Sequence, residues 1–403
     1  MTAPEQQTDH LMYKVPGGDW HSLTAEDQAG DSKTQDERFQ QVRAAKEELK
    51  NVLLSSLQMQ HLVVLSGSGC SREAGGPSMG DLWNAAIGKE PSAKAKRIAE
   101  RIHFSLEPVK LRNIEAFLSQ AEAFLQVQND ECVRTFINEC KKKILAECSE
   151  FLDTEKLGAH QTFLHRLSRR RVRDQRLKVF TTNYDLCFER AAAELGGVAM
   201  NGFSFMAPRG YDPRFFSYDI IRRPRSAGDL GNYLEGVFLL YKLHGSVNWA
   251  RLEDGTIQEK SNPEPEEACL IYPATGKYQQ SFLQPYLESI SQYLAALREP
   301  NTCVLAVGFG FNDDHFSEPL LAAVQSNPHL RLIVVNPGSK DQDEKSDKAN
   351  RYWQQFFDFG QKGEDIWFIN AGFSAFAEMI PDLKALTPAD NLMKAIQGVA
   401  KGK

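Results

Sequence analysis

The sequence lacks the features that mark several classes of protein. None of its seven cysteines forms a C-x-x-C pair and their number is odd, which argues against both a zinc ribbon and a disulfide framework. No apolar run approaches the length that a bilayer requires, and the polar first ten residues do not resemble a signal peptide. These absences predict a cytoplasmic protein that has no membrane span and works in a reducing environment.

A strong positive charge is also missing. The net charge is −6 and the pI is near 5.9, so the chain has no global attraction to nucleic acid or to an anionic membrane. One basic run, RLSRRRVRDQRLK at residues 166–178, departs from this balance. We interpret it as a solvated helix end, with contact to DNA or to an acidic surface of a partner as the alternative.

Short apolar stretches rich in Val, Ile, Leu and Phe recur along the chain and alternate with helical or loop segments. Such near-continuous apolar strands are typical of a sheet covered on both faces. The alternation predicts a doubly wound, Rossmann-like α/β fold with a parallel sheet. The predicted strands are 62–67, 177–183, 237–245, 302–310, 330–338 and 365–370.

Segments without strand character divide the chain. Apolar residues at helical spacing from Phe39 to Leu57 predict an N-terminal helix, and residues 1–36 before it are expected to be loosely ordered. Asn113 is expected to cap a helix within an inserted helical module. The acidic stretch 250–268 is predicted to be a surface loop. The expected organisation is an N-terminal segment and helix (1–60), an α/β domain (61–83 and 176–375), the inserted module (84–175) and a helical tail (376–403).

The stretch GSGCSREAGG at residues 67–76 follows the first predicted strand. Gly67 and Gly69 allow a tight turn, and a helix after the loop could aim free N–H groups at a pyrophosphate. No G-K-[ST] follows and residue 72 is Arg, so this is neither a Walker A loop nor the usual dehydrogenase loop. Taken alone, it is equally well explained as a tight turn. Cys70 is interpreted as a small packed residue rather than a reactive thiol.

Four further motifs follow in one order, each at a predicted strand end: TTNYD (181–185), KLHGS (242–246), GFGFND (308–313) and VNPG (335–338). With the glycine loop, this series resembles the sirtuin family, whose fold binds NAD. The resemblance covers about residues 62–77 and 179–370. It implies that NAD contacts Gly67, Ser68, Gly69, Ser71, Gly75, Thr182, Asp185, Gly308, Gly310 and Asn336.

The departures from the family pattern bear on activity. Deacylases of the family carry two C-x-x-C pairs soon after the H-G, whereas no cysteine lies between Cys187 and Cys269 here, so no zinc is expected. Met79 and Gly80 replace a Phe–Arg pair, and Thr182 replaces a Gln. These differences weigh against recognition of acyl-lysine. Together with NIEAFL (113–118), the pattern is most similar to bacterial sirtuin-like effectors of anti-phage defence that cleave NAD.

Asn183 and His244 are the predicted catalytic residues. Loss of nicotinamide leaves an oxocarbenium-like sugar, so the reaction needs a positioned water more than an acid. An Asn side chain can donate and accept hydrogen bonds, and a His near its usual pKa of about 6.5 can take a proton at neutral pH. Asp185 is expected to pin the Asn183 loop by accepting backbone N–H bonds, and Asn336 to hold the adenosine ribose.

Each of these residues has a structural alternative. Asn183 alone would be a helix N-cap, and His244 alone a satisfied core histidine. Asp313 and Asp314 could suggest a metal site, although a loop or helix cap is the preferred interpretation. His160 and His165 are treated as structural.

The preferred hypothesis is therefore an NAD glycohydrolase that depletes NAD during phage infection. The resemblance implies a homo-oligomer and, for a compact chain of this kind, a HerA-type hexameric ATPase as partner. The helices predicted at 37–57 and 113–152 are the expected assembly surfaces, and the isolated chain is expected to be weakly active. A protein deacylase, an ADP-ribosyltransferase, a non-catalytic sensor of NAD or ADP-ribose and a DNA-binding subunit remain as alternatives.

Overall fold

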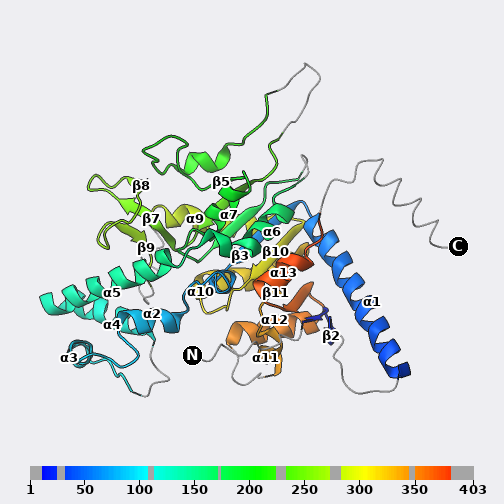
Figure 1. Ribbon diagram of the computed structural model, residues 1–403, viewed down its shortest axis with the longest axis horizontal. Helices are drawn as coiled ribbons and strands as arrows, with labels where there is room; N and C mark the ends of the chain where they lie inside the picture. Colours follow the sequence, from blue (N-terminus) through cyan, green and yellow to red (C-terminus); the bar gives the residue numbers. More distant parts are fainter. Residues whose placement is uncertain are drawn as a thin grey trace.

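The computed structural model describes residues 11–24, 32–107, 113–170, 174–223, 233–272, 283–344 and 350–382. In these ranges, nine strands form one sheet in the order β2-β1-β12-β11-β10-β3-β4-β6-β5 (Figure 1). The strands are Met12–Lys14 (β1), Trp20–Ser22 (β2), His61–Ser66 (β3), Lys178–Thr181 (β4), Val198–Met200 (β5), Val237–Lys242 (β6), Thr302–Val307 (β10), Leu330–Val335 (β11) and Ile366–Asn370 (β12). No helix in the same ranges is both long and apolar enough to cross a bilayer.

The strands from β12 to β5 run parallel, and the strand order reverses at β3. From β3 the chain builds β4, β5 and β6 on one side, then β10, β11 and β12 on the other. The doubly wound α/β fold predicted from the sequence is confirmed. In such folds ligands bind beyond the carboxyl ends of the strands where the order reverses, which here means beyond β3, β4 and β10.

Both faces of the sheet are covered by helices. Leu62 and Val64 of β3 pack on one face, and Val63 and Leu65 pack on the other, because successive side chains of a strand point in opposite directions. The first face is covered by α1 (Ser32–Leu57), α6 (Gly158–Leu167), α7 (Cys187–Glu194) and α13 (Phe373–Met379). The second is covered by α9 (Tyr286–Arg298), α10 (Asp314–Ser326) and α12 (Arg351–Gln361), with the short α11 (Ser339–Glu344) beside α12.

A separate group of helices forms its own apolar cluster at one end of the molecule, away from α1 (Figure 1). It consists of α2 (Met79–Ala86), α3 (Ala93–Arg101), α4 (Ile114–Val127) and α5 (Glu131–Glu150). Asn113 caps α4 as predicted, since its Oδ1 accepts a 2.8 Å hydrogen bond from the Glu115 N–H. We refer to α2–α5 as the helical module.

A small antiparallel sheet lies against the helical module. Its order is β8-β7-β9, from β7 (Gly245–Arg251), β8 (Ile257–Glu259) and β9 (Ala268–Leu270). The prediction that residues 250–268 form a surface loop is therefore wrong where β8 lies. Ile257 of β8 is buried against Trp249 and Phe203, and this single covered position is too little apolar pattern to reveal a strand in the sequence.

The N-terminal residues also carry more structure than the sequence suggests. β1 and β2 form an antiparallel hairpin that pairs with β12, the last of the parallel strands, and the Tyr13 hydroxyl donates a 2.6 Å hydrogen bond to Glu48 of α1. The expectation of loose order is thus wrong for residues 11–24, while 1–10 and 25–31 lie outside the described residues. The helix predicted from Phe39 to Leu57 is confirmed and begins earlier, at Ser32.

Arginines of the basic run 166–178 bond to the protein itself. Arg166 donates to the Ala377 carbonyl at 2.8 Å, at the carboxyl end of α13, and Arg170 donates to the Leu57 carbonyl at 2.5 Å, at the end of α1. Positive charge at these helix ends is favourable. The interpretation of a solvated helix end is wrong for these two side chains. Residues 171–173 of the run lie outside the described residues, as does most of the predicted C-terminal tail, 383–403.

The burial of His160 in α6 leads to a prediction of how the free energy of unfolding depends on pH. Its ring is buried between Phe188 and Phe373, and neither ring nitrogen has a hydrogen-bond partner among the described residues. Burial lowers the pKa of His160 to about 4. The unfolded chain, where the pKa is about 6.5, therefore binds a proton first as the pH falls. We expect this group to lower the free energy of unfolding by about 3 kcal/mol between pH 6.5 and pH 4.

Denaturant unfolding of the wild type and of His160→Leu across this pH range checks the expectation. The variant should lose less stability than the wild type as the pH falls, because it has no buried imidazole to protonate. Parallel curves for the two proteins would show that His160 does not set this part of the pH dependence.

Candidate active site

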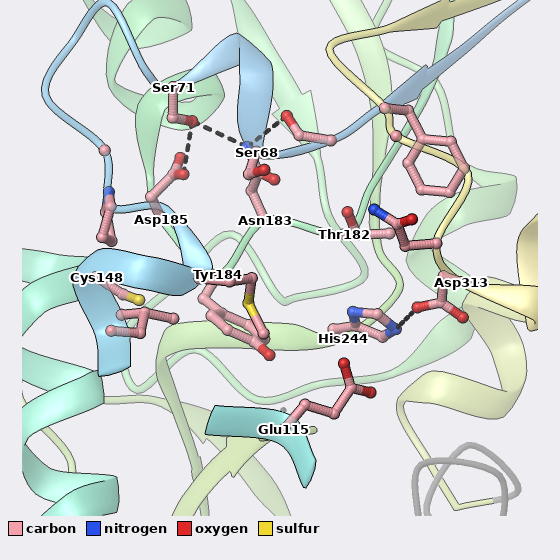
Figure 2. Close-up of a pocket in the computed structure, with 18 of the residues that line it drawn as sticks. Ser68, Ser71, Glu115, Cys148, Thr182, Asn183, Tyr184, Asp185, His244 and Asp313 are labelled. Carbon is pink, nitrogen blue, oxygen red and sulfur yellow. Dashed lines mark hydrogen bonds and ion pairs between the residues drawn. The ribbon is translucent and has the colours of Figure 1, made fainter. Parts of the chain in front are cut away.

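A cavity of about 200 Å³ opens beyond the carboxyl ends of β3, β4, β6 and β10 (Figure 2). Eight of the predicted site residues line it: Gly67, Ser68, Ser71, Thr182, Asn183, Asp185, His244 and Gly310. Its size is below the usual 300–1,000 Å³ of small-molecule sites, so its enclosed part suits one end of a dinucleotide. The parallel sheet thus brings together segments that are far apart in the sequence.

Two of the predicted glycines, Gly69 and Gly308, do not line the cavity but pack the loops that form it against each other. The Gly69 N–H donates to the Gly308 carbonyl at 2.9 Å, and a Cβ on Gly69 would lie only 2.6 Å from the Gly308 Cα. Gly308 has a φ of +59°, which side chains rarely adopt. Neither residue lines the cavity, so their shared role is close packing of the β3 and β10 loops.

The other two predicted residues lie outside the cavity wall. Gly75 has a φ of +102° and turns the chain between Ser71 and α2. Asn336 follows β11, and its side-chain oxygen accepts a 2.9 Å hydrogen bond from the Gly338 N–H. It stands at the same edge of the sheet, one strand farther from the cavity than Gly308.

The N–H groups at the start of the helix after the glycine loop are partly satisfied by the protein itself. α2 begins at Met79 and is closed by a capping box, in which the Ser78 hydroxyl accepts from the Asp81 N–H and the Asp81 carboxylate accepts from the Ser78 N–H. Bonds from Ser78 and from Arg72 lower the pKa of Asp81 to about 2. The first turn of α2 is therefore already capped by a carboxylate, which is itself paired with Arg72 at 2.8 Å.

Asn183 is buried and holds the glycine loop. Its Nδ2 donates to the Gly67 carbonyl at 3.0 Å and to the Ser71 hydroxyl at 2.9 Å. A carbonyl only accepts, so the nitrogen must face Gly67 and the side-chain Oδ1 must face the other way. That Oδ1 makes no hydrogen bond within the described residues and can accept one from a water or a ribose hydroxyl. The alternative of a simple helix N-cap is wrong, because α7 begins only at Cys187.

Asp185 continues the same network. Ser71 donates to its Oδ2 at 2.7 Å (Figure 2). Its Oδ1 accepts a 3.0 Å hydrogen bond from the Cys187 N–H. The prediction that Asp185 accepts a backbone N–H is confirmed. The chain of donors from Asn183 through Ser71 to Asp185 links the β3 loop to the β4 loop and fixes which end of the Asn183 amide faces the cavity.

His244 lines the cavity beside Asp313, and its Nε2 lies 3.1 Å from the Asp313 Oδ2 (Figure 2). The ring N–H does not point along this line well enough to make a hydrogen bond, so the contact is an ion pair when His244 is protonated. Asp313 is also the N-cap of α10, as predicted, and its Oδ1 accepts from the His315 N–H. The carboxylate can stabilise an imidazolium formed during a reaction.

Neither the pairing of Asp313 with His244 nor the contribution of the helical module to the cavity could be predicted from the sequence. Figure 2 shows the Glu115 carboxylate, from the first turn of α4, on the His244 side of the cavity. Met79, Leu82, Cys148 and Phe151 also line the cavity. The Asn113 cap places Glu115 in a helical first turn, but no signal in the sequence points that turn at the cavity.

Cys70 is a packed residue, as interpreted from the sequence. Its thiol donates to the Val307 carbonyl at 3.2 Å, and burial raises its pKa to about 12. Among the described residues, no group of three or more His, Cys, Asp or Glu side chains is arranged to hold a metal ion. The polar side chains that line the cavity include those of the Asn183 network and of the His244–Asp313 pair, with Glu115 on the His244 side.

Comparison with known proteins places a SIR2-like domain over residues 177–357, which is fewer than half of the 403 residues. This match indicates a sirtuin-like fold for the part that runs from β4 to α12. No curated protein matches the sequence.

Solved structures of Sir2 proteins align with most of this chain at low sequence identity. A Sir2 homologue in complex with NAD is 13% identical, with a TM-score of 0.42 over 82% of this chain and 91% of that chain. A mutant Sir2 homologue bound to ADP ribose is 15% identical, with a TM-score of 0.42 over 84% and 98%. A structure that addresses the mechanism and regulation of Sir2 enzymes is 13% identical, with a TM-score of 0.39 over 83% and 95%.

Proposed function

We propose that the chain is an NAD glycohydrolase, which converts NAD and water to nicotinamide and ADP-ribose. The observation that carries the proposal is the arrangement of an outward-facing Asn183 Oδ1 and a carboxylate-backed His244 in one cavity where the strand order reverses. The SIR2-like match over residues 177–357 supports a nicotinamide dinucleotide as the ligand.

The reaction breaks the bond between the ribose C1′ and the nicotinamide nitrogen. The bonding electrons go to the ring, which leaves as neutral nicotinamide, and positive charge develops on the sugar. The Asn183 Oδ1 accepts a hydrogen bond from the attacking water, and His244 takes the proton that this water loses as its oxygen bonds to C1′. Asp313 stabilises the imidazolium that results. The carboxylates of Glu115 and Asp185 face the same cavity and favour positive charge there.

Product analysis tests the proposal. NAD incubated with the protein should give nicotinamide and ADP-ribose in equal amounts, with no loss of rate when EDTA is added. Chromatography should be run with and without a partner ATPase, and with an acetylated peptide in a parallel sample. An acetylated ADP-ribose product would identify a deacylase instead, and NAD that remains intact in every sample would contradict the proposal.

The biological setting is part of the same proposal. The sequence resemblance supports a cytoplasmic homo-oligomer that acts in anti-phage defence by depleting NAD, with a HerA-type ATPase as partner. Since Glu115 and Cys148 of the helical module line the cavity, assembly through α4 and α5 would alter the site directly. α1 is the second proposed assembly surface.

A further inference from the structure

Lys242, the last residue of β6, is only 1% exposed and has no role in the chemistry proposed above. It precedes His244 by two positions in KLHGS. A buried lysine is costly unless each of its three N–H donors finds an acceptor. The contacts of this ammonium group therefore indicate the role of the buried positive charge.

Three acceptors surround the Lys242 Nζ. It contacts the Asp185 carbonyl closely, lies 3.3 Å from the Tyr184 carbonyl and lies 3.2 Å from the Glu189 Oε1. Two of the three are therefore backbone atoms of the loop that carries Asn183. The Tyr184 carbonyl also accepts from the Val247 N–H at 3.0 Å, so this part of the loop is tied to both β6 and β7.

Glu189 of α7 offsets the lysine charge. Its Oε2 is buried and has no hydrogen-bond partner among the described residues, and burial raises its pKa. A well-packed apolar pair would serve stability as well as this ion pair does, because removal of two charges from water costs about as much as their attraction returns. What an apolar pair could not do is hold the two loop carbonyls.

We infer that Lys242 is a positioning residue for the cleavage of NAD: it anchors the Tyr184–Asp185 backbone so that the side chains of Asn183 and Asp185 stay aligned in the cavity. The inference rests on the proposed function. In this role the Lys242 ammonium group does not contact the substrate. It affects the reaction only by holding the loop that carries Asn183 and Asp185.

The double variant Lys242→Met/Glu189→Leu tests positioning, because it replaces the ion pair with an apolar pair and leaves neither of the two charges buried alone. We expect the protein to stay folded with a modestly lower melting temperature, because the two loop carbonyls lose the lysine as donor. We expect kcat to fall about 100-fold, since a shift of about 1 Å in a reacting group costs that much. Affinity for ADP-ribose, measured by calorimetry, should change much less than kcat. A kcat equal to that of the wild type would overturn the inference.

Lys242→Arg is the second variant. It keeps the charge and the partner Glu189, but the planar guanidinium cannot reproduce the contacts of a compact ammonium group, so kcat should again fall while the protein stays folded. If neither variant folds, Lys242 is a folding residue and the inference is wrong.

Lys178→Met is the matched control. Lys178 is a half-buried lysine at the opposite end of the neighbouring strand β4, whose Thr181 is the register partner of Lys242. Its removal should leave kcat unchanged. A wild type that does not cleave NAD would refute the proposed function itself, whereas an active wild type with an equally active double variant would refute only the role of Lys242.

Discussion

Replacement of His244 by alanine is expected to lower the rate of NAD cleavage by about 10²–10⁴-fold, because a positioned acid–base group contributes about that much. The imidazole stands at the end of β6 with Asp313 3.1 Å from its Nε2, and Figure 2 shows the other ring nitrogen turned away from that carboxylate. The measurement is the rate of nicotinamide release at saturating NAD. A melting curve should show that the variant is folded.

Two further variants provide an intermediate case and a negative control for His244→Ala. Asp313→Asn keeps the N-cap of α10, since Asn caps as well as Asp, but removes the negative charge beside His244. Its rate should fall between those of the wild type and His244→Ala. His329→Ala removes an exposed histidine far from the cavity and should leave the rate of NAD cleavage unchanged. A His244→Ala protein that turns over NAD at the wild-type rate would exclude His244 from the mechanism.

Asn183→Ala is the second change with a large expected effect. It removes the Oδ1 that faces the cavity and the amide that donates to the Gly67 carbonyl and to the Ser71 hydroxyl, although the Cys70 N–H still donates to Gly67 and Ser71 still donates to Asp185. We expect the rate of NAD cleavage to fall by at least about 100-fold, because the attacking water loses its positioning group. The free energy of unfolding should also fall by about 1–3 kcal/mol, because two buried hydrogen bonds are lost and each contributes about 0.5–1.5 kcal/mol.

Ser71→Ala separates the two effects. It removes one acceptor of the Asn183 amide but keeps Oδ1 and the bond to Gly67. Its stability should fall as in Asn183→Ala, while its rate should fall much less. Equal losses of rate in Ser71→Ala and Asn183→Ala would mean that Asn183 only supports the glycine loop and does not act on the substrate.

The sequence was sufficient to predict the parallel strands and the positions of the site loops. Each strand from β3 to β12 that lies inside the sheet is apolar on both faces, as Leu62 to Leu65 illustrate, and such runs are visible without a structure. Because the carboxyl ends of parallel strands share one edge, Gly67, Asn183 and His244 could be placed together from their order alone.

The features that could not be predicted from the sequence are short strands and side chains whose partners are distant in the chain. β1, β2, β5 and β8 are three residues each, too short to show a period. Asp313 is an ordinary N-cap until the fold brings His244 beside it. Lys242 looks like one more residue of the predicted strand 237–245, and Glu115 like a polar residue in a first turn. In each case the role depends on the element that packs against the residue in the fold. The local sequence pattern does not contain that information.

The most direct test of the account is a crystal structure of the His244→Ala protein soaked with NAD. We predict that the nicotinamide ribose occupies the cavity between the β3, β4 and β10 loops. Its C1′ should face the Asn183 Oδ1 and the space left by the imidazole. A dinucleotide bound elsewhere, or one whose C1′ faces away from residues 183 and 244, would contradict the account.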